Sequence, residues 1–318
     1  MNASRIRDFV RAETSGPVFN VTYRYGQNVP AKNGAYGANV HAPRSAWFLE
    51  EQRAGGLDII DGAARPVKSL GLVALGLKMF HYGLGREAAN GSFPGSAWPF
   101  HGTALFLSEA APALIVLKSS SLNPNFREEI DWDVSRMQRA AYYMVRSVGG
   151  AGHVDDRTKT HRRFEAAIAL GATGVLASDR TLVRWSETYA RQGIHMERPD
   201  GVMPEDGGHD SGYQAVGMIN ASRYLVLVAR GKLRTALGAA LAKGEAWELS
   251  RVRPDGSVNQ TGDTRTVGCS ERNPQGQCKT VFYAPIFEAL AWWAAISGDA
   301  KYAHASKAVW RHSGYGAK

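Results

Sequence analysis

The sequence lacks several features that would assign a protein to a class at once. Its 318 residues include two cysteines, too few for the four-ligand set of a structural zinc site. No window approaches the ~20 apolar residues of a membrane-spanning helix. The first sixteen residues are charged and lack the apolar stretch of a signal peptide. We therefore expect no metal and no membrane partner; either the chain is cytoplasmic or a leader has been removed from it.

Signature motifs of common enzyme classes are missing too. We find no P-loop, no dinucleotide-binding glycine motif, no His-Glu-x-x-His and no Gly-x-Ser-x-Gly, so no cofactor is expected. The net charge is +9, which favours anionic partners. The basic residues form no arm, zinc finger or helix-turn-helix, so nucleic acid is not the expected partner. An acidic polysaccharide or oligosaccharide fits the charge better.

The two cysteines, Cys269 and Cys278, flank a short polar loop that contains glycine and proline. Two cysteines that close one short loop indicate a disulfide in an oxidising compartment. A secreted or periplasmic protein follows from that interpretation. Two free thiols in a cytoplasmic protein remain the alternative.

Hydrophobic spacing predicts an all-α protein. In the segment 67–84 the apolar residues recur three and four positions apart, as on one face of a helix. Residues 1–62 are rich in Gly, Asn, Pro and Tyr, and we expect them to wrap irregularly around a helical body over 63–318, within a single catalytic domain 1–318. The predicted helices cover 5–12, 45–54, 67–84, 101–118, 131–148, 161–177, 180–192, 213–229, 230–244, 281–297 and 300–311.

A short pattern repeats along this body. An Asn or Asp followed by Gly, a third residue and an apolar residue occurs at 90–93, 200–203 and 255–258. The distance from the first copy to the second is twice that from the second to the third. A missing copy, halfway between the first two, would fall near 147–150. Such a period suits one helical hairpin with a long loop. We therefore predict an incomplete α/α toroid, a ring of hairpins whose long loops gather on one face.

The densest polar cluster lies at 204–214 and combines carboxylates with a histidine and a tyrosine. Two glycines allow the backbone to bend before His209, and a helix is expected to begin near Ser211 with Asp210 or Ser211 as its cap. If that helix extends back far enough, His209 and Tyr213 share one face. This cluster is the first candidate site.

Basic residues at other helix starts add candidates. Arg162 and Arg163 follow His161 at the head of an apolar helix, where positive charge opposes the helix dipole and calls for a compensating partner such as an anion. Arg265 lies just before the cysteine loop, and His101 lies at the start of another helix.

Two of these motifs resemble a segment of a known enzyme family. The pattern Asp200-Gly201…Gly207-Gly208-His209…Tyr213, with the helix that begins at His161, is similar to a segment of the α/α-toroid polysaccharide lyases, the group of hyaluronate, chondroitin AC and xanthan lyases. The resemblance implies cleavage of a uronate-containing polysaccharide by β-elimination. The asparagine with which those lyases bind substrate falls on or near His161.

Elimination removes the proton on C5 of a uronate, so a donor or cation must hold the neighbouring carboxylate while negative charge develops. A base takes the proton and an acid protonates the leaving oxygen. The expected catalytic residues are Tyr213, His209 and His161. The expected substrate-binding residues are Arg162, Arg163, Arg265, His101, Glu205 and Asp210.

Two other functions fit the same residues. Glu205 and Asp210 could flank a glycosidic bond as the carboxylate pair of a glycoside hydrolase, and toroids host such enzymes. A non-catalytic glycan-binding protein is the second alternative.

Overall fold

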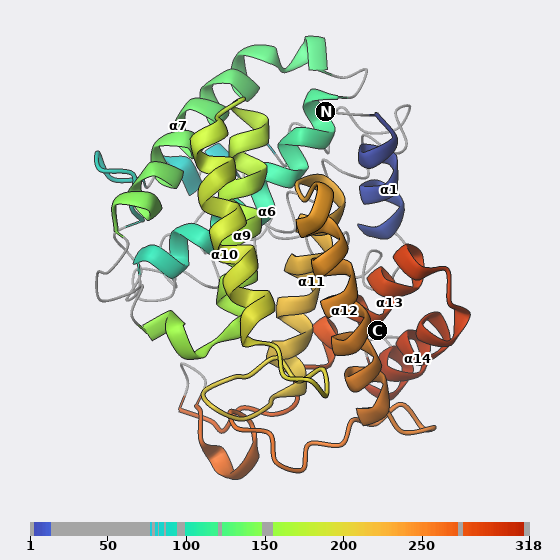
Figure 1. Ribbon diagram of the computed structural model, residues 1–318. Coiled ribbons are helices and arrows are strands. Elements are labelled where there is room, and N and C mark those ends of the chain that lie inside the picture. Colours follow the sequence, from blue (N-terminus) through green and yellow to red (C-terminus); the bar gives the residue numbers. More distant parts are fainter. Residues whose placement is uncertain are drawn as a thin grey trace. The chain divides into compact units, whose positions relative to one another are not determined.

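A computed structural model describes residues 3–13, 77, 80–81, 83–85, 87–93, 99–119, 123–147, 155–272 and 276–314. This part of the chain is mostly helical, and its extended segments form only isolated β-bridges, which confirms the predicted all-α class. Figure 1 shows the helices, which are α1 (Ala3–Glu13), α6 (Pro99–Lys118), α7 (Arg127–Arg146), α9 (Thr160–Leu176), α10 (Arg180–Met196), α11 (Ser211–Leu227), α12 (Gly231–Arg251), α13 (Tyr283–Ser297) and α14 (Ala300–His312). Three short 3-10 helices are η1 (Asn123–Asn125), η2 (Asp155–Thr158) and η3 (Val267–Cys269).

Most predicted helices are present within a few residues of their expected ends. The prediction for α12 was wrong at its end, because the helix passes through Gly244 and continues to Arg251. A Cβ built on Gly244 would lie 3.0 Å from the Met203 Cε and 3.2 Å from the Met218 Sδ, so this glycine serves close packing rather than termination. The predicted helix at 45–54, most of that at 67–84 and most of the N-terminal wrap lie outside the described residues.

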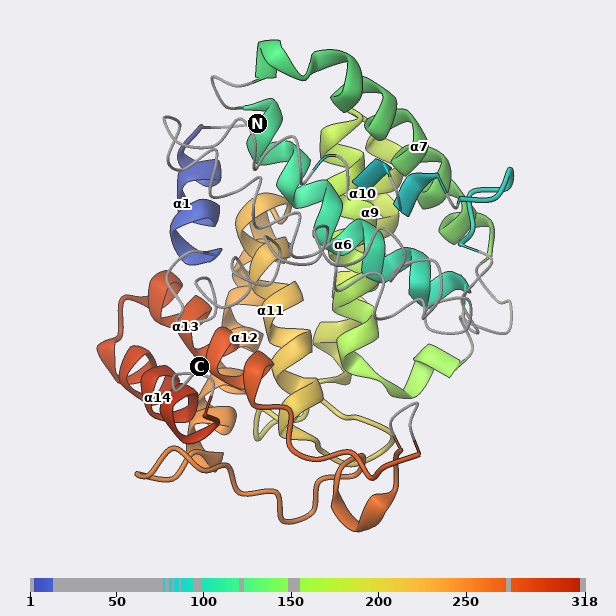
Figure 2. The ribbon, with the colours of Figure 1, turned by 180° about the vertical axis from the view of Figure 1, so that it is seen from behind.

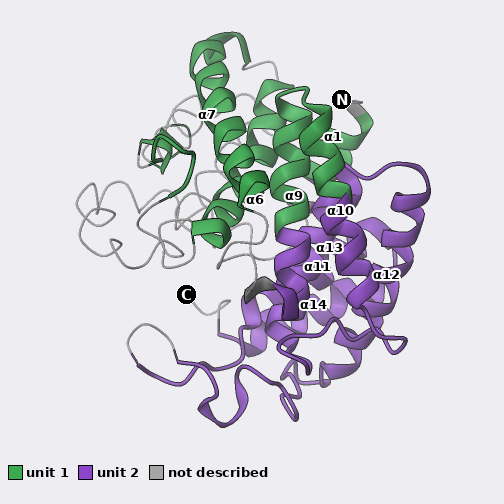
Figure 3. Ribbon diagram, turned by 60° about the vertical axis from the view of Figure 1, so that its left-hand side comes forward, with its two compact units in different colours: residues 1–10, 20–154, 166–187 green, residues 11–19, 155–165, 188–318 purple. Residues whose placement is uncertain are grey.

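The chain separates into two compact units, coloured in Figure 3. Unit 1 takes its described residues from 1–10, 20–154 and 166–187, and in it α6 packs against α7. Unit 2 comprises described residues of 11–19, 155–165 and 188–318. There α11 packs against α12 and α13, and α13 packs against α14. Neighbouring helices in the sequence thus pair as hairpins, while the predicted toroid and the single domain over 1–318 stay predictions.

Helix α6 departs from one expectation. Among the described residues it is a helix long and apolar enough to cross a membrane by length and composition. Of its apolar window, 83% is buried inside the protein, which is how the core helix of a globular fold also behaves. The helix therefore carries no argument for a membrane.

The three copies of the predicted repeat adopt one local structure. In each, the Asn or Asp side chain accepts a hydrogen bond from the amide two residues ahead, and the glycine has a positive φ that L side chains avoid. Each glycine also faces a backbone carbonyl of a later helix. A Cβ would come within 2.5 Å of that oxygen in every copy; the pairs are Gly91 with Arg139, Gly201 with Lys243 and Gly256 with Ala308. The fourth copy near 147–150 falls mostly outside the described residues.

Two loops of unit 2 meet at one end of α11. Figure 2 shows the segment between α10 and α11 beside the long segment between α12 and α13. The Thr264 amide donates to the His209 carbonyl at 2.8 Å, and the Thr264 hydroxyl donates to the Glu205 carbonyl at 2.7 Å. These bonds fix the two loops together and bring the candidate residues to one place.

Candidate functional site

A tight turn presents Glu205. The backbones of Glu205 and Gly208 exchange hydrogen bonds at 3.1 and 3.2 Å, and Asp206 and Gly207 between them both have positive φ, as in a two-residue hairpin turn. A Cβ on Gly208 would lie 2.1 Å from the Thr264 Cγ2. One glycine of the predicted double-glycine bend thus allows the turn, and the other allows the second loop to approach.

Glu205 is fully buried and holds His161. One carboxylate oxygen accepts from the His161 amide at 3.0 Å, and the other lies 2.7 Å from the His161 Nδ1. Burial raises the pKa of Glu205 to about 8, although the His161 amide and the charge of Arg265 act against that rise. These two contacts fix the imidazole of His161 in orientation.

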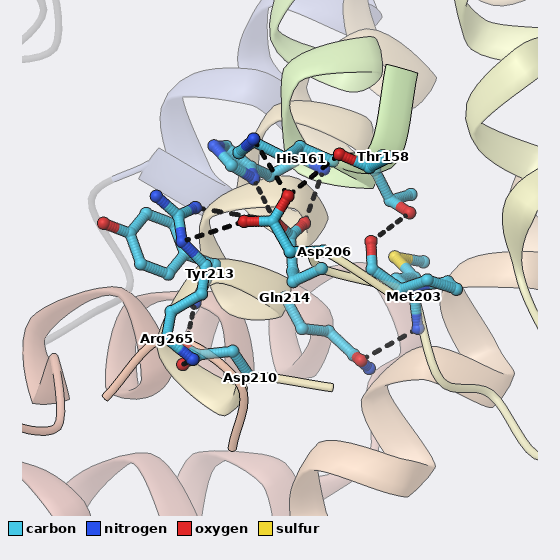
Figure 4. Close-up of polar contacts among 12 residues, drawn as sticks. Thr158, His161, Met203, Asp206, Asp210, Tyr213, Gln214 and Arg265 are labelled. Atoms are coloured by element: carbon cyan, nitrogen blue, oxygen red, sulfur yellow. Dashed lines mark hydrogen bonds and ion pairs between the residues drawn. The ribbon is translucent and has the colours of Figure 1, made fainter. Parts of the chain in front are cut away.

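Tyr213 enters the site from the first turn of α11. Asp210 caps the helix and accepts from the Tyr213 amide at 3.1 Å, which confirms that the helix begins at Ser211. The Tyr213 ring lies 5.0 Å from the His161 ring, and the Arg265 guanidinium carbon is 3.4 Å from the Tyr213 ring centroid. Figure 4 shows Arg265 against the face of the tyrosine, with His161 close by. The stacked cation is the arrangement of a cation–π contact.

Arg265 connects the parts of the site. Its amide donates to Asp210 at 3.3 Å, and its guanidinium lies 3.6 Å from Glu205. The Nε donates to Glu271 at 3.0 Å. Arg265 is itself almost fully buried, so its charge must be compensated, and Glu271 is the carboxylate that bonds its guanidinium directly.

The cysteine loop supplies two groups that sequence reasoning missed, Glu271 and Lys279. Cys269 and Cys278 form the predicted disulfide, and Lys279 directly follows it. The Lys279 Nζ lies 2.5 Å from the Tyr213 hydroxyl and 2.6 Å from a Glu271 oxygen. The hydroxyl donates to Glu271 at 3.2 Å. The sequence signal was nearness to the cysteines, because Glu271 lies two residues after Cys269 and Lys279 directly follows Cys278.

Charges and burial set the protonation states of this group. Burial raises the pKa of the Tyr213 phenol, and the neighbouring cations Arg265 and Lys279 oppose the rise only in part. The phenol is therefore neutral at pH 7. Burial works to raise the pKa of Glu271, but Lys279 and Arg265 bring it below its ordinary value overall. Burial works to lower the pKa of Lys279, but Tyr213 and Glu271 raise it overall.

His209 does not share a helical face with Tyr213, because it precedes the cap Asp210. Its Nε2 instead lies 3.1 Å from the Thr261 carbonyl and 3.5 Å from Asp263, and its ring meets Trp247 edge-on at 5.4 Å. The structure thus groups His161, rather than His209, with the tyrosine.

The other predicted residues lie on α9 and α6, and Asp206 follows Glu205 in the tight turn. Arg163 is buried, with its guanidinium 5.9 Å from the Tyr189 ring centroid, so an aromatic ring faces the charge that was expected to require an anion. Arg162 is half-buried in the first turn of α9. His101 lies on α6, in unit 1. Asp206 pairs with Lys159 at 2.9 Å.

A second group of buried acids lies in unit 2, around Glu245, Glu248 and Asp263. Burial raises the pKa of Glu245 to about 8 and that of Asp263 to about 7. Burial also raises the pKa of Glu248 well above its ordinary value, helped by the charges of Glu245 and Asp263. Within the described ranges no cluster of three or more such side chains is arranged to hold a metal ion.

Comparison with known proteins adds no relative. No protein-family model, no curated protein and no solved structure matches the chain.

Proposed function

We propose that the protein is a polysaccharide lyase that cleaves a uronate-containing polysaccharide by β-elimination. The observation that carries the proposal is the grouping of a neutral tyrosine hydroxyl, a histidine oriented by a buried carboxylate, and two cations. The contacts of Tyr213 with His161, Arg265 and Lys279 make up this group. Each supplies a function that elimination requires.

The step balances with these groups. When Glu205 is ionised and accepts from the Nδ1–H of His161, the imidazole takes the C5 proton through Nε2. The electron pair forms the C4–C5 double bond, and the bond from C4 to the glycosidic oxygen breaks. Tyr213 donates its proton to that oxygen. A proton passed from the imidazolium to the phenolate restores the resting site.

Lys279 and Arg265 assist at the two points where negative charge develops. Arg265 is placed to hold the substrate carboxylate, which lowers the energy of the carbanion at C5. Lys279 lies 2.5 Å from the tyrosine oxygen and stabilises the phenolate left after proton donation. Tyr213 is the acid in this scheme, in keeping with its raised pKa.

The positions of Glu205 and Asp210 favour elimination over hydrolysis. A glycoside hydrolase needs two carboxyl groups that reach the glycosidic bond. Glu205 is 0% exposed and holds His161, and Asp210 is 1% exposed and caps α11. Both are engaged in internal bonds, so this pair is badly placed for hydrolysis.

The predictions of the fold, the compartment and the substrate are part of this proposal. The paired helices and the repeated turns support an incomplete α/α toroid, with the site on the face where the loops gather. The disulfide supports an oxidising compartment, hence a secreted or periplasmic protein. The net charge of +9 supports an acidic polysaccharide as substrate.

Product analysis tests the proposal. The protein is incubated with a panel of acidic polysaccharides, and the products are followed by ultraviolet absorbance and mass. Unsaturated uronate ends support the lyase. Products heavier by one water indicate a hydrolase, and binding without cleavage indicates a glycan-binding protein; either result overturns the proposal.

A further inference from the structure

The carboxylate of Glu271 lies among the groups that a substrate carboxylate would need. One oxygen lies 2.6 Å from the Lys279 Nζ and accepts from the Tyr213 hydroxyl at 3.2 Å. The other accepts from Arg265 through Nε at 3.0 Å and through a second guanidinium nitrogen at 2.5 Å. Two cations and one hydroxyl thus converge on one carboxylate.

This set of donors is unusually complete for an internal ion pair. A guanidinium that donates through two nitrogens, with an ammonium on the other oxygen, forms charge-assisted bonds to both carboxylate oxygens. Arg265 is held in place by Asp210 and by the tyrosine ring behind it. The site is therefore preorganised to bind a carboxylate of any origin.

We infer that Arg265 and Lys279 form a carboxylate-binding site for the uronate of the substrate, next to the Tyr213 hydroxyl that donates to the glycosidic oxygen, and that Glu271 occupies this site as an internal competitor. The inference rests on the proposed function for the identity of the ligand. A substrate carboxylate binds by displacing Glu271 from the two cations. The loop between Cys269 and Cys278 thus keeps the free protein in a self-inhibited state.

Exposure makes the displacement feasible. The side chains of Glu271 and Lys279 are each 31% exposed, whereas that of Arg265 is 6% exposed. The ion pair between Lys279 and Glu271 reaches solvent and so contributes little net stability. The charge of the buried Arg265 stays compensated, because the substrate carboxylate replaces that of Glu271. The loop also remains anchored without the Glu271 side chain, because the Lys279 amide donates to the Glu271 carbonyl at 3.0 Å and the disulfide closes it.

The charges around Glu271 set what the site accepts. Arg265 and Lys279 face it directly, and Asp206 lies 3.9 Å from the Arg265 Nε on another side. The His161 ring centroid lies 5.0 Å from that of Tyr213. One added carboxylate is compensated by the two cations once Glu271 leaves, whereas a neutral sugar gains nothing from the exchange. The site therefore selects monoanionic sugar units.

Binding of free D-glucuronate tests the inference without requiring cleavage. Calorimetric titrations compare the wild-type protein with Glu271→Gln, which keeps the shape and removes the competing charge. Glu128→Gln is the matched control, since Glu128 is exposed on α7 in unit 1 and the net charge changes equally. Lys279→Met removes one cation, and D-glucose replaces D-glucuronate as the neutral ligand.

If Glu271 fills the site in most molecules, its removal tightens D-glucuronate binding by about tenfold or more, because the competent fraction rises toward one. Lys279→Met weakens binding, and D-glucose binding does not change. Equal affinity of Glu271→Gln, Glu128→Gln and wild type, or no measurable binding by any of them, would overturn the inference. Tighter binding by Glu271→Gln with no polysaccharide cleaved would sustain the inference and refute the lyase. Cleavage of polysaccharide without tighter D-glucuronate binding by Glu271→Gln would sustain the lyase and refute the inference.

Discussion

Gly217 on α11 lies directly against the backbone of His161 at the start of α9. A Cβ built on Gly217 would be 3.0 Å from the His161 Cα and 3.3 Å from its Cβ. The missing side chain allows the two helices to approach closely enough for the histidine ring to meet the ring of Tyr213. The position of His161 therefore depends on a glycine more than fifty residues away.

Gly217→Ala should displace His161 and reduce activity. Overpacking of a tight contact costs typically ~1–3 kcal/mol, which urea unfolding measures. Gly238→Ala on α12 is the control, because nothing lies within 4 Å of a Cβ there and alanine improves helix propensity by ~1 kcal/mol. Equal stability and activity in the two variants would show that the close approach does not position His161.

The buried Glu245 should make the protein less stable as the pH rises. Burial raises its pKa to about 8 in the folded protein, against 4.5 in the unfolded chain, so the folded state binds more protons between these values. The stabilisation is complete below about pH 4.5 and is lost as the pH rises through 8. In Glu245→Gln, the fall in melting temperature between pH 5 and 8.5 should be smaller than in the wild type. An unchanged slope, equal to that of Glu128→Gln, would contradict the assignment.

The disulfide should stabilise unit 2 and hold the tyrosine contacts. A loop with a sequence separation of nine residues predicts a loss of about 2–3 kcal/mol when both cysteines become serine, by the chain-entropy account. Thiol titration of the denatured, unreduced protein should find no free thiol. Two titratable thiols, or unfolding of the double variant at the wild-type denaturant concentration, would refute this role.

The helices could be predicted from the sequence because their apolar residues follow a helical period that packing in the core preserves. The end of α12 could not be predicted from the sequence. The predicted helix ended at Gly244, but this glycine makes room for Met203 and Met218, and such a contact exists only after the chain has folded. The three described copies of the Asx-Gly pattern adopt the same turn, because each copy encodes its turn locally.

The site could be predicted in part. Tyr213, His161 and Arg265 were chosen one by one for their chemistry, and the structure brings them together. His209 was grouped with Tyr213 on an assumed helical face, but the cap at Asp210 places it outside the helix. Glu271 and Lys279 lie in a polar segment without periodicity, and only their nearness to the cysteines marked them. Their roles come from contacts that the disulfide loop makes after folding.

Glu205→Gln should lower the activity, although Glu205 itself transfers no proton in the proposed mechanism. Glu205 holds His161 through two contacts, and a neutral amide offers no negative charge to the imidazolium that forms when His161 takes a proton. We expect a loss of roughly 10–100-fold in kcat, the range seen when a supporting partner is removed, with little change in KM. An unchanged kcat would show that Glu205 does not orient His161. A large rise in KM would show that Glu205 binds substrate.

The most direct test of the central claim is the rate at which unsaturated uronate ends form with the wild-type protein and with Tyr213→Phe. The substitution removes only the hydroxyl, so the stacking on Arg265 should survive, and circular dichroism should be unchanged. Loss of the proton donor should lower the rate by roughly 10²–10⁴-fold. Near-full formation of unsaturated ends by Tyr213→Phe, or products heavier by one water from the wild type, would contradict the account.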